Sequence, residues 1–160
     1  MKTCLFAGTF DPITKGHYDT VIELNKKYQK IIVAIGVNPK KVPYFSLNER
    51  LSFLKSAFKD CPFVTVDSYT SLTVDYMKKM GVKVLVRGIR NNADLEYEKE
   101  NERLSKTIYP NLVTEYVKAK EGEENLSSTY VRELISKGKD FYSLVPENAY
   151  PLIKKAIEKK

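Results

Sequence analysis

The chain is poor in the residues that build metal sites and disulfide frameworks. Its 160 residues include one histidine and two cysteines, too few for the Cys/His cluster of a zinc site. Cys4 lies within an apolar stretch and Cys61 precedes Pro62 in a different predicted element, so we expect two reduced thiols without chemistry. This cysteine usage favours the cytoplasm, and the composition is compatible with a magnesium ion carried mainly by phosphates.

Long apolar runs are also missing. The longest, 31–35 and 82–86, fall far below the roughly 18 residues that a membrane span requires. Near the amino terminus, no basic segment leads into a continuous apolar core, so the sequence predicts no signal peptide. We therefore expect a soluble protein with no membrane partner.

The charge balance indicates an anionic partner without identifying it. Lysine and arginine number 27 against 20 acidic residues, a formal net charge of +7. This charge and the eleven tyrosines leave a nucleic-acid-binding module open as a rival function. The tyrosines are scattered, however, and no nucleic-acid motif is present, so we expect no nucleic-acid partner.

Strand-like and helical patterns alternate along the chain. Apolar runs typical of strands lie at 3–7, 31–37, 63–66, 82–86 and 112–117, and helical patterns lie at 16–28, 47–58, 71–80 and 92–108. Two further helices are expected, one capped at Ser127-Ser128 and ending near 136, the other running from Pro146 to 158. This order predicts a single α/β domain over 1–160, with a Rossmann-like, doubly wound, parallel five-stranded sheet and helices on both faces.

Two local signals support these helix limits. Ser46-Leu47-Asn48-Glu49 matches a capping box, and Gly81 follows the third helix as a stop signal. In such sheets, ligands bind beyond the carboxyl ends of the strands. We therefore expect the loops 8–15, 38–45, 87–91 and 118–125 to converge on one crevice.

The segment from Gly8 to His17 has the features of a phosphate site. Its glycines allow close approach of the backbone to an anion, and it ends in the first turn of a helix, where free N–H groups favour phosphate. His17 is then placed to donate a hydrogen bond to a phosphate oxygen, and Thr9 to hold the attacking group. Thr14-Lys15-Gly16-His17 resembles the T/H-x-G-H signature of the nucleotidyltransferase superfamily, and the whole segment resembles the phosphopantetheine adenylyltransferase family.

Further blocks extend this resemblance in order and spacing across almost the whole chain. Val86–Arg90 is similar to the family's R-G-L/I-R motif, 94–98 to its D-x-E-Y-E run, and 126–132 to its I-S-S-S/T-x-x-R motif. Taken alone, Glu98 also fits an ordinary carboxylate on a helix face, and the hydroxyls at 127–129 fit ordinary helix capping. Between prolines, Lys41 takes the place of the lysine that contacts substrate, with its neighbour Lys40 as the alternative.

The resemblance implies a set of site residues. The implied ATP contacts are Thr9, Phe10, His17, Gly88, Ile89, Arg90, Glu98, Glu123, Glu124, Asn125, Leu126, Ser127, Ser128 and Thr129. The implied contacts of the second substrate are Thr9, Lys41, Thr73 and Arg87, and the implied catalytic residues are His17, Thr9 and Lys41.

The implied reaction is transfer of the adenylyl group of ATP to 4'-phosphopantetheine, which gives dephospho-CoA and pyrophosphate. The attacking phosphate is already anionic at neutral pH, so we expect in-line attack without a general base, with Mg2+ bridging the outer phosphates of ATP. The family further implies a homohexamer and feedback inhibition by coenzyme A. Other acceptors stay open, among them nicotinamide or flavin mononucleotide and glycerol phosphate.

Overall fold

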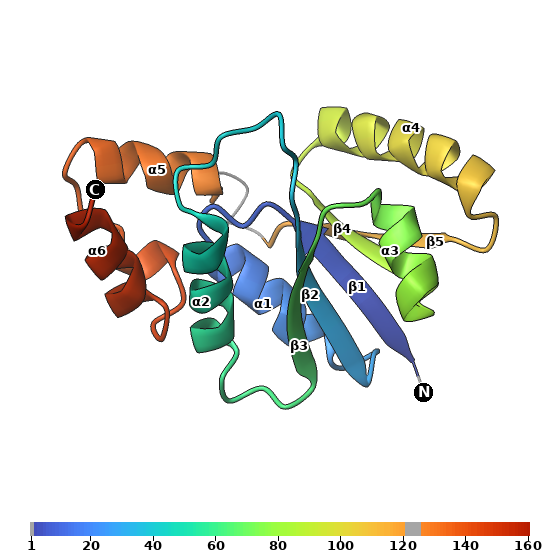
Figure 1. Cartoon of the computed structure of the whole chain (residues 1–160), viewed down its shortest axis with the longest axis horizontal. Helices are drawn as coiled ribbons and strands as arrows, with labels where there is room; N and C mark the ends of the chain where they lie inside the picture. Colours follow the sequence, from blue (N-terminus) through green and yellow to red (C-terminus); the bar gives the residue numbers. More distant parts are fainter. Residues whose placement is uncertain (1, 121–125) are drawn as a thin grey trace.

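A five-stranded parallel sheet forms the centre of the molecule (Figure 1). The computed structural model describes residues 2–120 and 126–160. The strands are β1 (Thr3–Gly8), β2 (Lys30–Gly36), β3 (Val64–Tyr69), β4 (Val84–Ile89) and β5 (Val113–Lys118). The helices are α1 (Lys15–Leu24), α2 (Leu47–Ala57), α3 (Thr73–Met80), α4 (Asn92–Ile108), α5 (Ser128–Ser136) and α6 (Tyr150–Glu158), with a 3-10 turn η1 at Tyr142–Leu144.

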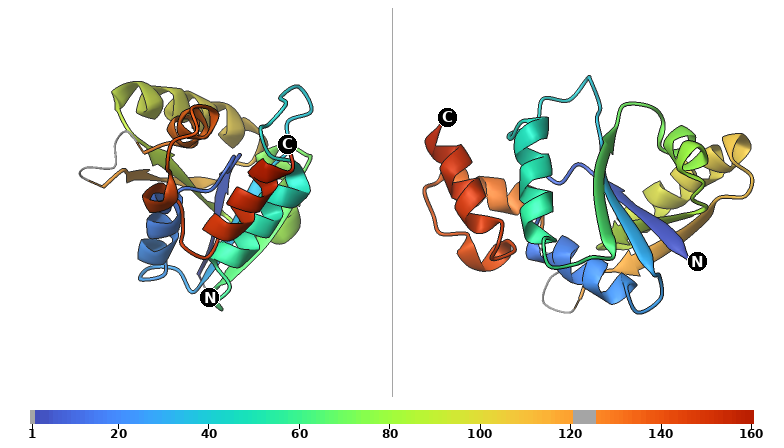
Figure 2. Two further views of the ribbon diagram at one scale, coloured as in Figure 1. Left: turned by 90° about the vertical axis from the view of Figure 1, so that its left-hand side faces the viewer. Right: turned by 60° about the horizontal axis from the view of Figure 1, so that its bottom comes forward.

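Alternate side chains of the strands enter two separate apolar clusters. In β1, Cys4 and Phe6 join a cluster with side chains of α1, α2, α5 and α6, whereas Leu5 and Ala7 join a cluster with side chains of α3. The helices therefore cover both faces of the sheet, as the views in Figure 2 also show. The predicted α/β, Rossmann-like fold is confirmed.

The strand order places a topological switch point between β1 and β4. The order is β3-β2-β1-β4-β5, so the chain leaves β1 toward β2 in one direction and leaves β4 toward β5 in the other. The loops that follow β1 and β4 therefore separate at the carboxyl edge of the sheet. A crevice at such a point is where doubly wound folds bind their ligands.

Local signals set most of the helix limits. Ser46 and Glu49 form the predicted capping box of α2, Gly81 ends α3 with a φ of 71°, and the Ser127 side chain accepts the Tyr130 N–H at the start of α5. Within the described ranges, no helix is both long and apolar enough to cross a bilayer.

Several predicted limits differ from the structure; for example, the first helix ends at Leu24 rather than at 28, and the third strand runs to Tyr69 rather than to 66. The last helix begins at Tyr150 rather than at Pro146, because the carbonyl of Pro146 accepts the N–H groups of Ala149 and Tyr150 in a preceding turn and Pro151 occupies the first helical turn. The fourth strand runs to Ile89 instead of ending at 86, since it pairs with β5 up to the Ile89–Lys118 position. Arg87 and Gly88 thus lie within β4 and, as successive strand residues, are directed to opposite faces of the sheet.

Candidate active site

His17 is fixed by the cap of the helix on which it lies. Thr14 is the N-cap of α1, and its Oγ1 accepts the His17 N–H at 3.3 Å. In return, Nδ1 of His17 accepts the Thr14 N–H at 3.0 Å. This reciprocal pair is a capping box in which an imidazole takes the place of the usual Glu or Gln. The ring orientation is therefore set by the backbone of the turn.

The same contact settles which ring nitrogen of His17 carries a proton. A backbone N–H only donates, so Nδ1 is an acceptor and has no proton. Burial of the ring and, second, the cation of Arg90 lower the pKa of His17 to about 4. At neutral pH the ring is uncharged and its proton is on Nε2, which makes Nε2–H a donor with no charge of its own.

Phe10 packs against His17 from the side of the apolar core. Its side chain is buried, and its ring meets the His17 ring edge to face, with the centroids 4.9 Å apart and the planes at 74°. Gly8 makes room for this ring, because a Cβ at Gly8 would lie 3.3 Å from it. Phe10 is an implied ATP contact, and the structure places it beneath the histidine in the apolar core.

A crevice of about 750 Å3 lies over His17 at the carboxyl edge of the sheet. All four connections that the sequence predicts to converge contribute to its wall. The site residues predicted from sequence that line it are Thr9, His17, Lys41, Gly88, Ile89, Arg90, Leu126, Ser127, Ser128 and Thr129. Lys40 is not among the lining residues. Its main-chain N–H donates to Oδ1 of Asn38 at 3.0 Å. The structure therefore favours Lys41 over Lys40.

The start of α5 is tied directly to the first loop. Ser127 caps the helix, and the Ser128 hydroxyl donates to the carbonyl of Pro12 at 2.7 Å. The free N–H groups of this helix start lie beside the crevice, where the positive end of the helix dipole favours an anion. This wall therefore suits phosphate groups.

Arg132 ends the 126–132 motif but is not in the set of site residues that the resemblance implies. It lines the crevice, its Nη1 donates to the carbonyl of Asp11 at 2.6 Å, and its Nη2 donates to the Thr129 hydroxyl at 3.1 Å. Two signals were available in the sequence: Arg132 is the arginine of that motif, and a residue three positions after Thr129 on a helix shares its face. Together with Lys41, Arg90, Lys118 and Lys120, it makes the lining rich in cations.

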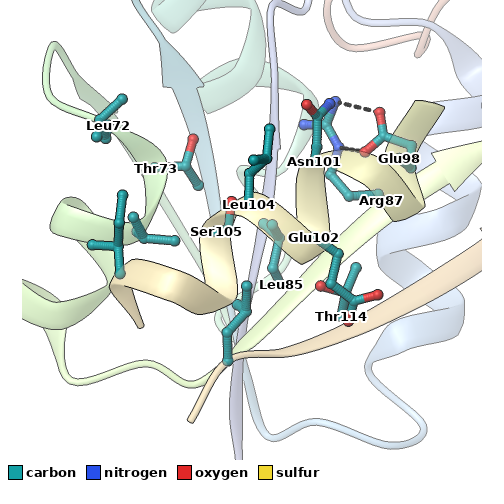
Figure 3. Close-up of a pocket in the computed structure, with 13 residues that line it drawn as sticks. Leu72, Thr73, Leu85, Arg87, Glu98, Asn101, Glu102, Leu104, Ser105 and Thr114 are labelled. Carbon is teal, nitrogen blue, oxygen red and sulfur yellow. Dashed lines mark hydrogen bonds and ion pairs between the residues drawn. The ribbon is translucent and has the colours of Figure 1, made fainter. Parts of the chain in front are cut away.

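Arg87, Glu98 and Thr73 lie together in a second pocket of about 340 Å3, between α3, α4 and the β4–β5 pair (Figure 3). Two nitrogens of Arg87 donate to the two carboxylate oxygens of Glu98 at 2.8 and 3.1 Å, and Nη1 donates to the carbonyl of Ala7. Such a bidentate pair is strong and directional. Glu98, an implied ATP contact, thus lines the pocket of Arg87 instead of the crevice.

The remaining predicted residues, Glu123, Glu124 and Asn125, lie outside the described residues. Arg90 is oriented by Asp94, whose Oδ2 is 3.4 Å from the guanidinium Nε and also accepts the Arg90 N–H. The site as described is thus a cationic crevice with a neutral histidine donor, and a second pocket whose lining includes an arginine–glutamate pair.

Fold and site together define the class of protein. Residues 5–134 match the family model described as cytidylyltransferase-like. Two solved structures share the fold. A putative nicotinate-nucleotide adenylyltransferase from Vibrio parahaemolyticus has a TM-score of 0.76 at 16% identity, over 100% of this chain and 97% of that chain. A bifunctional NMN adenylyltransferase/ADP ribose pyrophosphatase from Francisella tularensis has a TM-score of 0.72 at 19% identity. The match covers 96% of this chain but only 49% of that longer chain. The protein is a nucleotidyltransferase of the cytidylyltransferase-like class.

Curated relatives narrow the class. The chain is 42% identical to phosphopantetheine adenylyltransferase from Flavobacterium psychrophilum, over 92% of this chain and 97% of the relative. It is 38% identical to the enzyme of that name from Campylobacter fetus, over 96% of both chains. With the enzyme of that name from Clostridium botulinum it shares 36% identity, over 100% of this chain and 98% of the relative. The chain belongs to the phosphopantetheine adenylyltransferase family.

Proposed function

We propose that the protein transfers the adenylyl group of ATP to 4'-phosphopantetheine, giving dephospho-CoA and pyrophosphate as a step of coenzyme A biosynthesis. The family supports the reaction, and the state of His17 is the observation that supports the mechanism. In-line attack on the α-phosphorus builds negative charge on its non-bridging oxygens. An uncharged Nε2–H held by a helix cap is a preorganised donor to those oxygens.

No general base is needed in this proposal. The attacking phosphate already carries negative charge at neutral pH, and a histidine whose pKa is near 4 with Nδ1 engaged by the Thr14 N–H is a poor proton acceptor. Thr9 and Lys41, which line the same crevice, position and neutralise the attacking phosphate. Catalysis then rests on orientation and on fixed donors.

The outer phosphates of ATP are assigned to the opposite wall. Arg90 and the start of α5, with Ser128 and Thr129, supply the cation and the N–H and hydroxyl donors. A Mg2+ ion bound with ATP would supply positive charge to these outer phosphates, which Arg90 and the start of α5 would hold. In the described ranges, no three His, Cys, Asp or Glu side chains gather into a metal-binding group.

The pantetheine arm is assigned to the second pocket. Arg87 is at its end nearest β1, and the walls combine apolar side chains of Leu72, Leu85 and Leu104 with polar ones such as Thr73 (Figure 3). An arm of alternating amide and methylene groups suits such a mixed lining. In this assignment Arg87 contacts the anionic end of the substrate, and the pantetheine arm extends from there along the face of the sheet.

The test is pyrophosphate release with ATP and a panel of acceptors. We expect kcat/KM with 4'-phosphopantetheine to exceed that with nicotinamide mononucleotide, flavin mononucleotide or glycerol phosphate by about 10²-fold or more. Preference for another acceptor would refute the proposed substrate. Oligonucleotide binding without any turnover would instead favour the nucleic-acid-binding rival.

Three further properties follow from the family resemblance and are proposed with it. They are a homohexameric assembly, feedback inhibition by coenzyme A and a cytoplasmic location. Coenzyme A shares the pantetheine arm of the substrate, so competition with 4'-phosphopantetheine in steady-state kinetics tests the second. Sedimentation equilibrium tests the first.

A further inference from the structure

Arg50 is a buried cation to which the proposed mechanism gives no role. It lies in α2 with 5% of its surface exposed, and burial lowers its pKa against the opposing effect of Asp11. Burying a guanidinium costs several kcal/mol unless its donors are satisfied. The partners of Arg50 therefore indicate what this costly group does.

Both partners of Arg50 are main-chain carbonyls in the two loops that carry the attacking end of the site. Nε donates to the carbonyl of Phe45 at 3.0 Å, in the loop that holds Lys41. Nη1 donates to the carbonyl of Thr9 at 3.0 Å, in the loop between β1 and α1. One rigid fork thus joins the loops that follow two neighbouring strands.

The contact with Thr9 acts on an unusual backbone angle. Phe10 has a φ of 48°, which lies in the left-handed region and costs a residue other than glycine about 1–2 kcal/mol. The carbonyl carbon of Thr9 is one of the four atoms that define this angle. By holding the Thr9 carbonyl, Arg50 stabilises the conformation of Phe10.

Phe10 passes this constraint on to His17, because its ring packs edge to face against the imidazole. Asp11 adds a second tie between the same loops, since its carboxylate accepts the N–H groups of Tyr44 and Phe45 at 2.8 and 2.9 Å. A continuous set of contacts therefore runs from Arg50 through Thr9 and Phe10 to His17, and through Phe45 to the loop of Lys41.

We propose that Arg50 is a positioning residue for adenylyl transfer, one that holds Thr9, His17 and the Lys41 loop in the geometry required for attack. The inference rests on the function proposed above for the crevice. A lysine at this position keeps the charge but has a single ammonium group in place of the planar fork, so it does not reproduce both carbonyl contacts with the same geometry.

The experiment compares Arg50→Lys and Arg50→Gln with Arg103→Lys, an exposed arginine paired with Glu100 on α4. In Arg50→Lys we expect kcat to fall about 10²-fold, as small misplacements of reacting groups do. ATP affinity measured by calorimetry should stay within about threefold of wild type, because the groups assigned to its outer phosphates are untouched. The control Arg103→Lys should retain wild-type kcat.

A second readout separates positioning from mere stability. The chain has one histidine, so the ring signals of His17 in an NMR spectrum need no assignment. We expect the Cε1–H signal of folded Arg50→Lys to shift from its wild-type position, and that of Arg103→Lys to stay.

The outcomes distinguish this inference from the proposed function. If folded Arg50→Lys keeps wild-type kcat and the wild-type His17 signal while only its Tm falls, or if neither Arg50 variant folds, Arg50 is a core residue and the positioning role is refuted. If wild type itself turns over none of the acceptors, the proposed function fails, and the His17 signal still decides whether Arg50 sets the geometry of the histidine.

Discussion

The crevice over His17 and the pocket of Arg87 are built in different ways, although one strand serves both. In β4, Gly88 lines the crevice and Arg87 lines the pocket. Contacts to main-chain atoms hold the crevice, among them Thr14 N–H to His17 and Arg50 to the Thr9 carbonyl. In the pocket, the central contact is a side-chain ion pair between Arg87 and Glu98. We therefore expect changes in the crevice to act mainly on kcat, and changes in the pocket mainly on the KM of the acceptor.

The largest effect is expected for His17→Ala in the crevice. Removal of one preorganised donor to a transition state costs about 10² to 10³ in kcat. ATP binding, measured by calorimetry, should remain largely intact, because the outer phosphates have their own donors on α5. Lys15→Ala, two positions earlier on α1 and outside the crevice lining, is the matched control. Near-normal turnover of His17→Ala would contradict the proposed role of His17 as a donor to the transition state.

The next effect is expected in the pocket. Arg87→Met should raise the KM for 4'-phosphopantetheine about 10-fold or more with a smaller change in kcat, because it removes binding that ground state and transition state share. It also leaves Glu98, which is 9% exposed, as a buried carboxylate without its partner, a loss of about 3 kcal/mol in stability.

The double variant Arg87→Met/Glu98→Gln separates these two consequences. Thermal unfolding should show most of the lost stability restored, since no unpaired charge is left. Steady-state kinetics should show KM still raised. If KM returned to the wild-type value as well, Arg87 would serve the fold alone, and the contrast between the two pockets would not hold.

A smaller difference is expected between neighbouring lysines. Lys41 lines the crevice, whereas the lining residues do not include Lys40. Lys41→Met should lower kcat/KM for the acceptor about 10-fold, as loss of a charge-assisted contact does, and Lys40→Met should change it less than about twofold. Equal losses in the two variants would mean that the loop presents both lysines to the acceptor.

The fold was predictable because its signals are local. Alternating strand and helix patterns, the Ser46 capping box and the Gly81 stop all depend on residues within a few positions. The crevice was predictable for a related reason, because parallel strands place their following loops at one edge. Which side of β4 Arg87 faces was not predictable, since the expected strand ended at 86 and pairing with β5 carries it to Ile89.

The contacts that hold the site were also beyond sequence reasoning. Arg50 reaches Thr9 across 41 positions, and Arg132 reaches Asp11 across 121. Neither arginine has a local pattern that identifies its partner. The burial of Phe10 beneath His17 likewise depends on a positive φ that a phenylalanine seldom adopts.

The smallest effect is expected from pH, and it follows from the state of His17. Its pKa in the folded protein is lowered to about 4, so the NMR signal of this single histidine should show a neutral ring down to about pH 5. Turnover at saturating substrates should change less than about twofold between pH 7 and 8.5, because no histidine base titrates there.

In the unfolded chain the same ring titrates near its usual pKa of about 6.5. Unfolding therefore takes up a proton below that pH, and the contribution of His17 to stability should fall as pH drops from about 6.5 toward 4. His17→Ala should lack this part of the pH dependence of Tm. A histidine signal that titrates near pH 7 would contradict the neutral donor and would reopen the role of a base.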